Sequence, residues 1–194
     1  MKIAVSGTHC CGKSTLIAEF LAKHPDFAHE PEPYVTLQEN HGEIFPADPS
    51  VDDYFRQLEF NVERLREYKA GDRVICERSP VDFLAYVLAL YELQREKQAA
   101  WFVQRSLDLA SQAVELLDLI VFLPLEDDED FADSEDPELR GAVNSRLAGI
   151  LCDGEFNLFQ NNRPCILEAR GSTAERLLTI EAAIEGRSGR SFSI

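Results

Sequence analysis

The chain of 194 residues is poor in basic side chains. It carries 19 lysines and arginines against 35 aspartates and glutamates, which gives a net charge of -16 at neutral pH. Proteins that bind nucleic acid or anionic membranes need a basic surface to meet the phosphate groups. The deficit argues against a nucleic-acid partner or a DNA-handling role, and a bound phosphate must be held by local geometry and a metal ion.

Long apolar runs are also missing. No segment approaches the roughly 20 apolar residues that cross a bilayer, and the first residues, MKIAVSG, lack the apolar core of a signal peptide. We therefore expect a cytoplasmic protein without a membrane partner. The five cysteines form no CxxC pair and have no histidine at metal-ligand spacing, so we expect reduced thiols.

Short apolar runs alternate with segments of helical periodicity along the whole chain. The runs at 2–6, 73–80, 118–125 and 163–169 predict strands, and the run at 27–35 predicts the end of a further strand that Pro31 and Pro33 break. The segments between the runs predict helices. Strands that are apolar on both faces and separated by helices indicate a parallel sheet covered on two sides. We therefore expect a single domain over 1–194 with an α/β fold, in which a five-stranded parallel sheet lies in three α/β/α layers.

The first predicted strand leads directly into Gly7-Thr8-His9-Cys10-Cys11-Gly12-Lys13-Ser14-Thr15. This segment fits the P-loop pattern GxxxxGK(S/T) at every fixed position, and it precedes an amphipathic helix. In such a loop the backbone N–H groups and the helix N-terminus face phosphate groups, Lys13 contacts the β and γ phosphates, and Ser14 ligates Mg²⁺. The segment predicts a site for ATP and Mg²⁺, and a redox or metal role for the adjacent cysteines is the alternative at the variable positions.

Two further polar segments follow predicted strands. Glu32 stands after the second strand, and Glu77 and Arg78 follow the third. Because the carboxyl ends of parallel strands meet at one edge of a sheet, we expect these side chains near the P-loop. Glu32 can accept a proton from an attacking hydroxyl, Glu77 can hold Mg²⁺, and Arg78 can contact phosphate oxygens. The alternatives are an exposed loop glutamate at 32 and a structural salt bridge at 77–78.

Residues 126–136 include eight acidic residues in eleven positions and no basic one. Such a segment cannot pack in a core, so it is either a solvated linker or the base of a lid that closes over nucleotide. The lid would cover about 126–152 and include the helical run at 138–151.

Together these segments resemble a known family. GTHCCGKST, the EP at 32–33, ERSPVDFLAY at 77–86, DPELR at 136–140 and GSTAERL at 171–177 are similar to motifs of the small P-loop kinases and ATPases of the ribosylnicotinamide-kinase-like, AAA-domain group. They are more distantly similar to deoxynucleoside kinases. The resemblance implies that Glu32 is the base or substrate-binding acid, Glu77 the Mg²⁺-associated acid and Arg78 a phosphate contact. It also implies that Gly171 and Ser172 lie near the adenine.

The lid differs from the pattern of the resembled group at one position. The group places a first lid arginine a few residues before DPE-aromatic-Arg, and this position falls at about Asp133 here. Arg140 matches the second lid arginine, and Arg146 is a further candidate. Because six residues turn a helix by about 240°, the two arginines do not both face one site. Either Arg140 alone neutralises charge on the transferred phosphoryl group, or the lid function is weakened.

The helix expected at 51–69 offers candidate contacts to an acceptor: Tyr54, Phe55, Arg56, Gln57 and Asn61. In nucleoside kinases a Phe-Gln pair in this region binds the base, and in this chain Arg56 separates the two residues. An ordinary amphipathic helix is the alternative.

We therefore expect an ATP- and Mg²⁺-dependent kinase that phosphorylates a hydroxyl of a small molecule, with a nucleoside or nucleoside-like compound as the favoured acceptor. The competing hypothesis is a switch that binds ATP or GTP and a protein partner with little turnover, which Asp133 and the acidic segment favour. The chain shows no NKxD-like sequence of the kind that selects guanine, so adenine is expected. A homodimer is compatible with both hypotheses.

Overall fold

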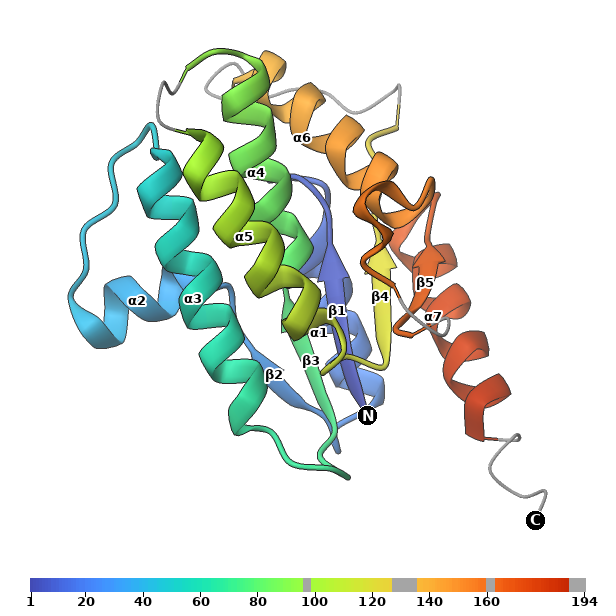
Figure 1. The fold of residues 1–194 in the computed structure, drawn as a ribbon. Coiled ribbons are helices and arrows are strands. Elements are labelled where there is room, and N and C mark those ends of the chain that lie inside the picture. Colours follow the sequence, from blue (N-terminus) through green and yellow to red (C-terminus); the bar gives the residue numbers. More distant parts are fainter. Residues whose placement is uncertain (96–98, 127–135, 160–162, 189–194) are drawn as a thin grey trace.

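The computed structural model describes residues 1–95, 99–126, 136–159 and 163–188. In these ranges five strands form one sheet in the order β2-β3-β1-β4-β5, and every neighbouring pair is parallel (Figure 1). The strands are β1 (Lys2–Ser6), β2 (Ala28–Glu30), β3 (Val74–Glu77), β4 (Leu119–Phe122) and β5 (Cys165–Glu168). The helices are α1 (Lys13–Lys23), α2 (Pro33–His41), α3 (Val51–Glu67), α4 (Pro80–Glu92), α5 (Ala99–Val114), α6 (Pro137–Leu151) and α7 (Thr173–Ser188), with a short 3-10 helix η1 (Glu155–Asn157).

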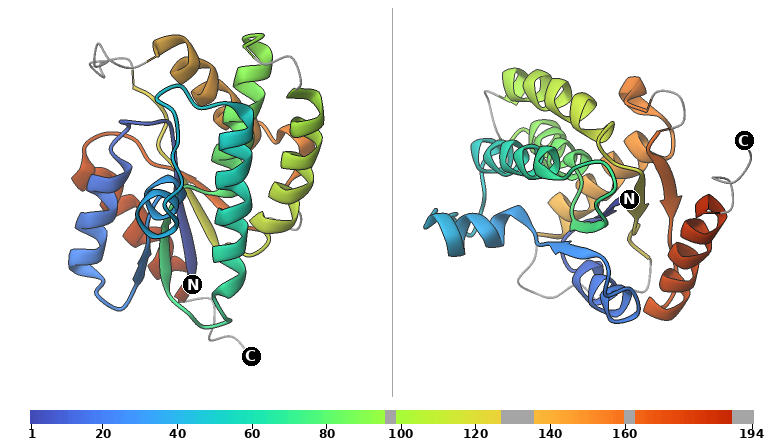
Figure 2. Two further views of the ribbon diagram at one scale, coloured as in Figure 1. Left: turned by 90° about the vertical axis from the view of Figure 1, so that its left-hand side faces the viewer. Right: turned by 90° about the horizontal axis from the view of Figure 1, so that it is seen from below.

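Helices cover both faces of the sheet. Figure 2 shows α1 and α7 on one face and α3, α4 and α5 on the other. Side chains of β1 alternate between the two cores: Ile3 and Val5 pack with residues of α1 and α7, whereas Ala4 packs with residues of α4. Burial on both faces explains why β1, β3 and β4 read as almost continuous apolar runs. The expected three-layer α/β/α fold with a five-stranded parallel sheet is confirmed.

The strand expected within 27–35 ends before Pro31 and Pro33, the two prolines expected to break it. β2 covers only Ala28–Glu30, and the chain then enters α2 at Pro33. Pro33 occupies the first helical turn, where its fixed φ suits the helix and its missing N–H costs nothing. The proline that seemed to break a strand therefore begins a helix, and Glu32 becomes the residue that precedes it.

Two helices that border the site begin with the same capping arrangement. In α3 the side chain of Ser50 accepts a hydrogen bond from the Asp53 backbone while Asp53 accepts one from the Ser50 backbone. Ser79 and Asp82 form the equivalent capping box at the start of α4. Each box satisfies N–H groups that a helix start leaves without intrahelical partners. The second box fixes the chain just after β3, where the candidate site begins.

Neither disulfides nor membrane-spanning helices contribute to the fold over the described ranges. All five cysteines are free thiols, and Cys11 and Cys76 are buried. Within the same ranges no helix is long and apolar enough to cross a membrane.

Replacing Leu84 by alanine should lower the free energy of unfolding by about 2–5 kcal/mol, because the side chain is fully buried in α4 and its removal leaves a cavity. The matched control is Leu178→Ala in α7, where the side chain is 62% exposed and the cost should be about 0.5 kcal/mol or less. Urea unfolding followed by circular dichroism measures both. Equal losses in the two variants would contradict the packing described here.

Candidate active site

Two glycines of the P-loop have positive φ angles, which favour glycine. Gly7 and Gly12 have φ angles of 155° and 89°, and Gly12 immediately precedes the first residue of α1. A Cβ atom built on Gly7 would lie 2.6 Å from Cys11 Sγ and 2.8 Å from the carbonyl oxygen of Leu123. The loop therefore places the N-terminus of α1 and its backbone N–H groups where a phosphate can bind.

Lys13 is held inside the loop. Its side chain is 4% exposed, and Nζ donates a hydrogen bond of 2.6 Å to the carbonyl oxygen of Thr8. Burial, with a smaller contribution from the nearby charge of Arg78, lowers the pKa of Lys13. A buried ammonium group is stabilised by an anion, so this side chain is suited to meet phosphate oxygens.

Two arginines from distant helices bind polar atoms of the loop. Arg140 of α6 is 1% exposed; it donates to Thr8 Oγ1 at 3.4 Å and to the carbonyl oxygen of Cys10 at 3.3 Å. Arg176 of α7 donates to the carbonyl oxygen of Cys11 at 2.9 Å. With Lys13, these side chains concentrate positive charge at one place in a strongly acidic protein. Sequence reasoning missed Arg176, because its position in GSTAERL gives no local sign of a contact with the P-loop.

Ser14 and Glu77 lie together beside Lys13. Ser14 Oγ donates a hydrogen bond of 2.7 Å to Glu77 Oε1, and Glu77 is 8% exposed at the end of β3. A hydroxyl and a carboxylate oxygen are the ligand types that Mg²⁺ prefers. The pair therefore fits the expected metal site in the chemistry of its donors.

Glu32 and Arg78 form an ion pair beside the start of the P-loop. The Arg78 side chain is 5% exposed and also donates to the carbonyl oxygen of Gly7 at 2.9 Å. Burial alone would raise the pKa of Glu32, but the positive charges of Arg78 and Lys13 outweigh it and lower that pKa. The Glu32 carboxylate is therefore ionised at neutral pH and directed toward the P-loop. The backbone of Arg78 has φ 78°, and Asn61 Nδ2 lies 3.5 Å from its carbonyl oxygen.

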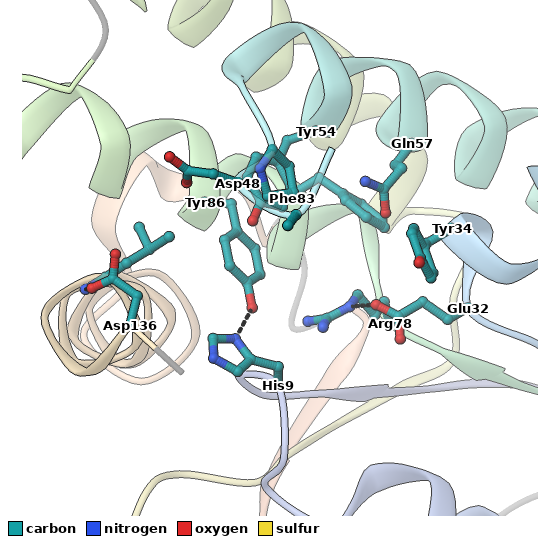
Figure 3. Close-up of a pocket in the computed structure, with 13 residues that line it drawn as sticks. His9, Glu32, Tyr34, Asp48, Tyr54, Gln57, Arg78, Phe83, Tyr86 and Asp136 are labelled. Atoms are coloured by element: carbon teal, nitrogen blue, oxygen red, sulfur yellow. Dashed lines mark hydrogen bonds and ion pairs between the residues drawn. The ribbon is translucent and has the colours of Figure 1, made fainter. Parts of the chain in front are cut away.

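A cavity of about 300 Å³ opens next to this ion pair. Figure 3 shows its labelled lining, with Glu32 and Arg78 on one side and aromatic rings from α3 and α4 above them. The rings of Tyr54 and Tyr86 stack with centroids 4.4 Å apart, and His9 Nδ1 lies 3.0 Å from the Tyr86 hydroxyl. Burial raises the pKa of both tyrosines, so they are neutral. The cavity lies between the P-loop and the acceptor candidates of α3.

The residues expected on α3 divide into two groups. Tyr54 and Gln57 line the cavity. Phe55 instead packs against Phe102 with ring centroids 5.6 Å apart, and Arg56 binds Glu43 at 2.7 Å. Of the two residues of the expected Phe-Gln pair, only Gln57 therefore reaches the cavity, and a different aromatic residue, Phe83 of α4, lines it.

Gly171 and Ser172 lie at the start of α7. The N–H of Gly171 donates to Glu126 Oε1 at 2.7 Å, and the same oxygen accepts a bond of 3.1 Å from Arg176. Ser172 donates its N–H to Glu175 at 2.8 Å and so caps the helix. These contacts join the end of the β4 segment to the loop before α7. A role for Gly171 and Ser172 beside adenine stays a prediction.

The candidate lid residues lie in different places. Arg140 contacts the P-loop, as described above. Arg146 points elsewhere, because Nε donates to Glu92 at 3.0 Å and Nη1 lies 3.5 Å from Glu155. Asp133, the position of the expected first lid arginine, is outside the described residues, as is most of the acidic segment. Arg140 is therefore the one arginine of this pair that reaches the candidate site.

The fold and the loop sequence together define a P-loop protein with a three-layer α/β/α domain. A family model described as an AAA domain matches residues 2–176, so the chain belongs to this AAA-domain family. Similar solved structures include deoxyadenosine kinase from M. mycoides with bound dCMP and dCDP, at 16% identity and a TM-score of 0.65 over 96% of this chain and 99% of that chain. Thymidylate kinase from Candida albicans has 16% identity and a TM-score of 0.65 over 96% and 92% of the two chains.

NadR protein in complex with NAD and AMP-PNP is a further similar structure. Its identity is 16% and its TM-score 0.62, with 97% of this chain covered. The chain spans about half of NadR, since 49% of that chain is covered. No match among curated proteins was found. At these identities the similarities establish the fold.

The substitution Gly7→Ala should destabilise the protein by more than about 1 kcal/mol, because the new methyl group would collide with Cys11 Sγ and the Leu123 carbonyl. Gly141→Ala in α6 is the matched control: its Cβ would meet nothing within 4 Å, so the change should stabilise the helix by about 0.5–1 kcal/mol. Thermal and urea unfolding measure both changes. A stable Gly7→Ala variant would show that the loop does not need its observed conformation.

Proposed function

We propose that the protein transfers the γ-phosphoryl group of ATP to a hydroxyl group of a small acceptor, of which a nucleoside or nucleoside-like compound is the favoured class. One observation carries this proposal. The ionised carboxylate of Glu32 lies between the P-loop and a cavity lined by aromatic side chains, and Arg78 binds both Glu32 and the P-loop carbonyl of Gly7. A phosphoryl donor and a hydroxyl acceptor could therefore meet beside one carboxylate.

The nucleotide side of the proposal rests on the P-loop. Lys13 and the N–H groups at the start of α1 would bind the β and γ phosphates. Ser14 and Glu77 would hold Mg²⁺, which when bound neutralises charge on the phosphates. Arg140 donates to Thr8 Oγ1 and to the carbonyl oxygen of Cys10, so its expected contribution is to keep the loop in shape and to add positive charge.

The acceptor side of the proposal rests on Glu32. A carboxylate in this place can accept the hydrogen bond of an attacking hydroxyl and orient its oxygen toward the phosphate. The ion pair with Arg78 fixes the Glu32 side chain and favours its charged form. Positioning by this pair, together with the charge of Lys13, would then supply most of the rate acceleration.

The charge of the cavity favours an acceptor without a phosphate group. Arg78 is the single lysine or arginine side chain among the described residues that line the cavity. Its guanidinium is already bound to Glu32 and to the carbonyl oxygen of Gly7. Glu32 and Asp48 add negative charge to the lining, whereas the carboxylate of Asp136 is paired with Arg95. A nucleoside monophosphate would bring its own negative charge next to these carboxylates, which costs free energy. We therefore expect nucleosides to be better acceptors than their monophosphates.

The test is ADP release from Mg·ATP in the presence of nucleosides, ribosylnicotinamide and nucleoside monophosphates. One unphosphorylated compound should stimulate turnover in the wild type. Lys13→Ala should abolish turnover, and Glu32→Gln should lower kcat by about 10²–10⁴ while ATP binding persists. Full activity in both variants would contradict the assignment. Nucleotide binding without stimulation by any compound would favour the nucleotide-dependent switch instead.

The pH dependence tests the state of Glu32. Its pKa is lowered from the ordinary value of 4.5, so the carboxylate should stay ionised as the pH falls to that value. We therefore expect kcat/KM to be flat from neutral pH down to about pH 5 and to fall only below that, as Glu32 takes up a proton. Far-UV circular dichroism at each pH checks that the protein stays folded. A loss of activity with a midpoint near pH 6 in a folded protein would contradict the lowered pKa.

A further inference from the structure

Asp82 is a buried carboxylate that caps α4 and that the proposed reaction does not use. It lies in the first turn of α4 and is 0% exposed. Its two oxygens have different partners. Oδ2 accepts hydrogen bonds from the backbone N–H of Ser79 at 2.8 Å and from Ser79 Oγ at 2.9 Å. Oδ1 accepts one of 2.9 Å from the N–H of Gly7, and it lies 3.5 Å from Nη1 of Arg78.

The contacts of Oδ2 are those of a helix cap. The capping box of α3 shows that one oxygen suffices for this task, since Asp53 Oδ2 accepts from the N–H of Ser50 at 2.8 Å and from Ser50 Oγ at 2.7 Å. Asp82 thus makes the same cap as Asp53 and in addition reaches the P-loop through its second oxygen. Helix capping does not explain why this second oxygen is buried against a loop and an arginine.

The Oδ1 contact closes a ring of interactions around the backbone of one residue, Gly7. Gly7 donates its N–H to Asp82, its carbonyl oxygen accepts from Nη1 of Arg78, and the same Nη1 lies beside Asp82. Gly7 is the residue whose backbone the P-loop requires in an unusual conformation. The start of the P-loop is therefore held from both sides by the carboxylate and the guanidinium.

Asp82 is also a counter-charge for a buried cation. Arg78 pairs with Glu32 on one side and with Asp82 on the other. Buried ions need such partners, because an unpaired charge in the interior is costly. Without Asp82, Glu32 would be the remaining counter-charge of the Arg78 guanidinium. We therefore expect the guanidinium to shift from its position between the P-loop and the cavity.

We propose that Asp82 is a positioning residue that couples the P-loop to the Glu32–Arg78 pair, so that nucleotide binding depends on it beyond its part in capping α4. The proposal rests on the proposed function for the role of Glu32. The expected effect of Asp82 on nucleotide binding rests only on its contacts with Gly7 and Arg78.

The experiment compares Asp82→Asn with Asp53→Asn. In each variant an amide replaces a carboxylate in a capping box, so both should lose a few degrees of thermal stability. The amide offers one acceptor oxygen where the carboxylate of Asp82 offers two, so the N–H of Gly7 or that of Ser79 loses its acceptor and Arg78 loses a counter-charge. We expect Asp82→Asn to weaken Mg·ATP binding about tenfold or more and Asp53→Asn to leave it unchanged. Isothermal titration calorimetry measures both affinities.

Equal affinity for Mg·ATP in the two variants would overturn the proposal and leave Asp82 as a helix cap. If the Asp82 variant does not fold, amide hydrogen exchange in the wild type decides. The N–H of Gly7 should be protected to the same degree as that of Ser79, and rapid exchange at Gly7 would overturn the proposal. Because the test measures Mg·ATP affinity and not turnover, it is separate from the test of the kinase reaction. A wild type that binds Mg·ATP but phosphorylates no acceptor would disprove the proposed reaction. The comparison of Asp82→Asn with Asp53→Asn would still decide the role of Asp82.

Discussion

The guanidinium of Arg78 is buried where the P-loop, α2 and α4 meet, and a charge in such a place is stable only when counter-charges and acceptors surround it. Glu32 and Asp82 supply the negative charge, and the carbonyl of Gly7 supplies an acceptor. These partners come from three different segments of the chain. Satisfying one buried cation therefore fixes the relative positions of the phosphate-binding loop, the candidate base and the wall of the cavity.

A second constraint is the conflict between the overall charge and the ligand. A protein with a net charge of -16 repels a nucleotide at long range. Lys13, Arg140 and Arg176 gather at the P-loop from α1, α6 and α7, and the N-terminus of α1 adds the positive end of its dipole. Salt screens the distant negative charges of the surface more than it screens charges within a few ångströms of a bound phosphate. The basic side chains at the P-loop can therefore favour phosphate binding although the protein as a whole is acidic.

Much of this architecture could be predicted from the sequence, because its signals are local. The P-loop has fixed spacing, and the apolar runs that become β1, β3 and β4 are buried on both faces of the sheet. Parallel strands bring their carboxyl ends to one edge, so the meeting of Glu32, Glu77 and Arg78 with the loop could be expected as well. The start of α2 could not, since Pro33 is equally compatible with the end of a strand and the beginning of a helix.

The missed parts of the site depend on contacts between distant residues. Arg176 reaches the P-loop from 165 positions away, and the second oxygen of Asp82 meets Gly7 from 75 positions away. Nothing beside either residue in the sequence marks these contacts. The turn of α3 that directs Gln57 into the cavity and Phe55 toward α5 likewise follows from how that helix packs.

The central claim is that an acceptor bound in the cavity beside Glu32 directs its hydroxyl group toward the phosphate of a bound nucleotide. ³¹P nuclear magnetic resonance of a reaction with Mg·ATP and the nucleoside that binds best would test it most directly. The account predicts that the γ-phosphate signal of ATP is replaced by that of a phosphomonoester of the nucleoside. Conversion of ATP into ADP and inorganic phosphate alone, or persistent ATP in a protein that binds it, would contradict the account.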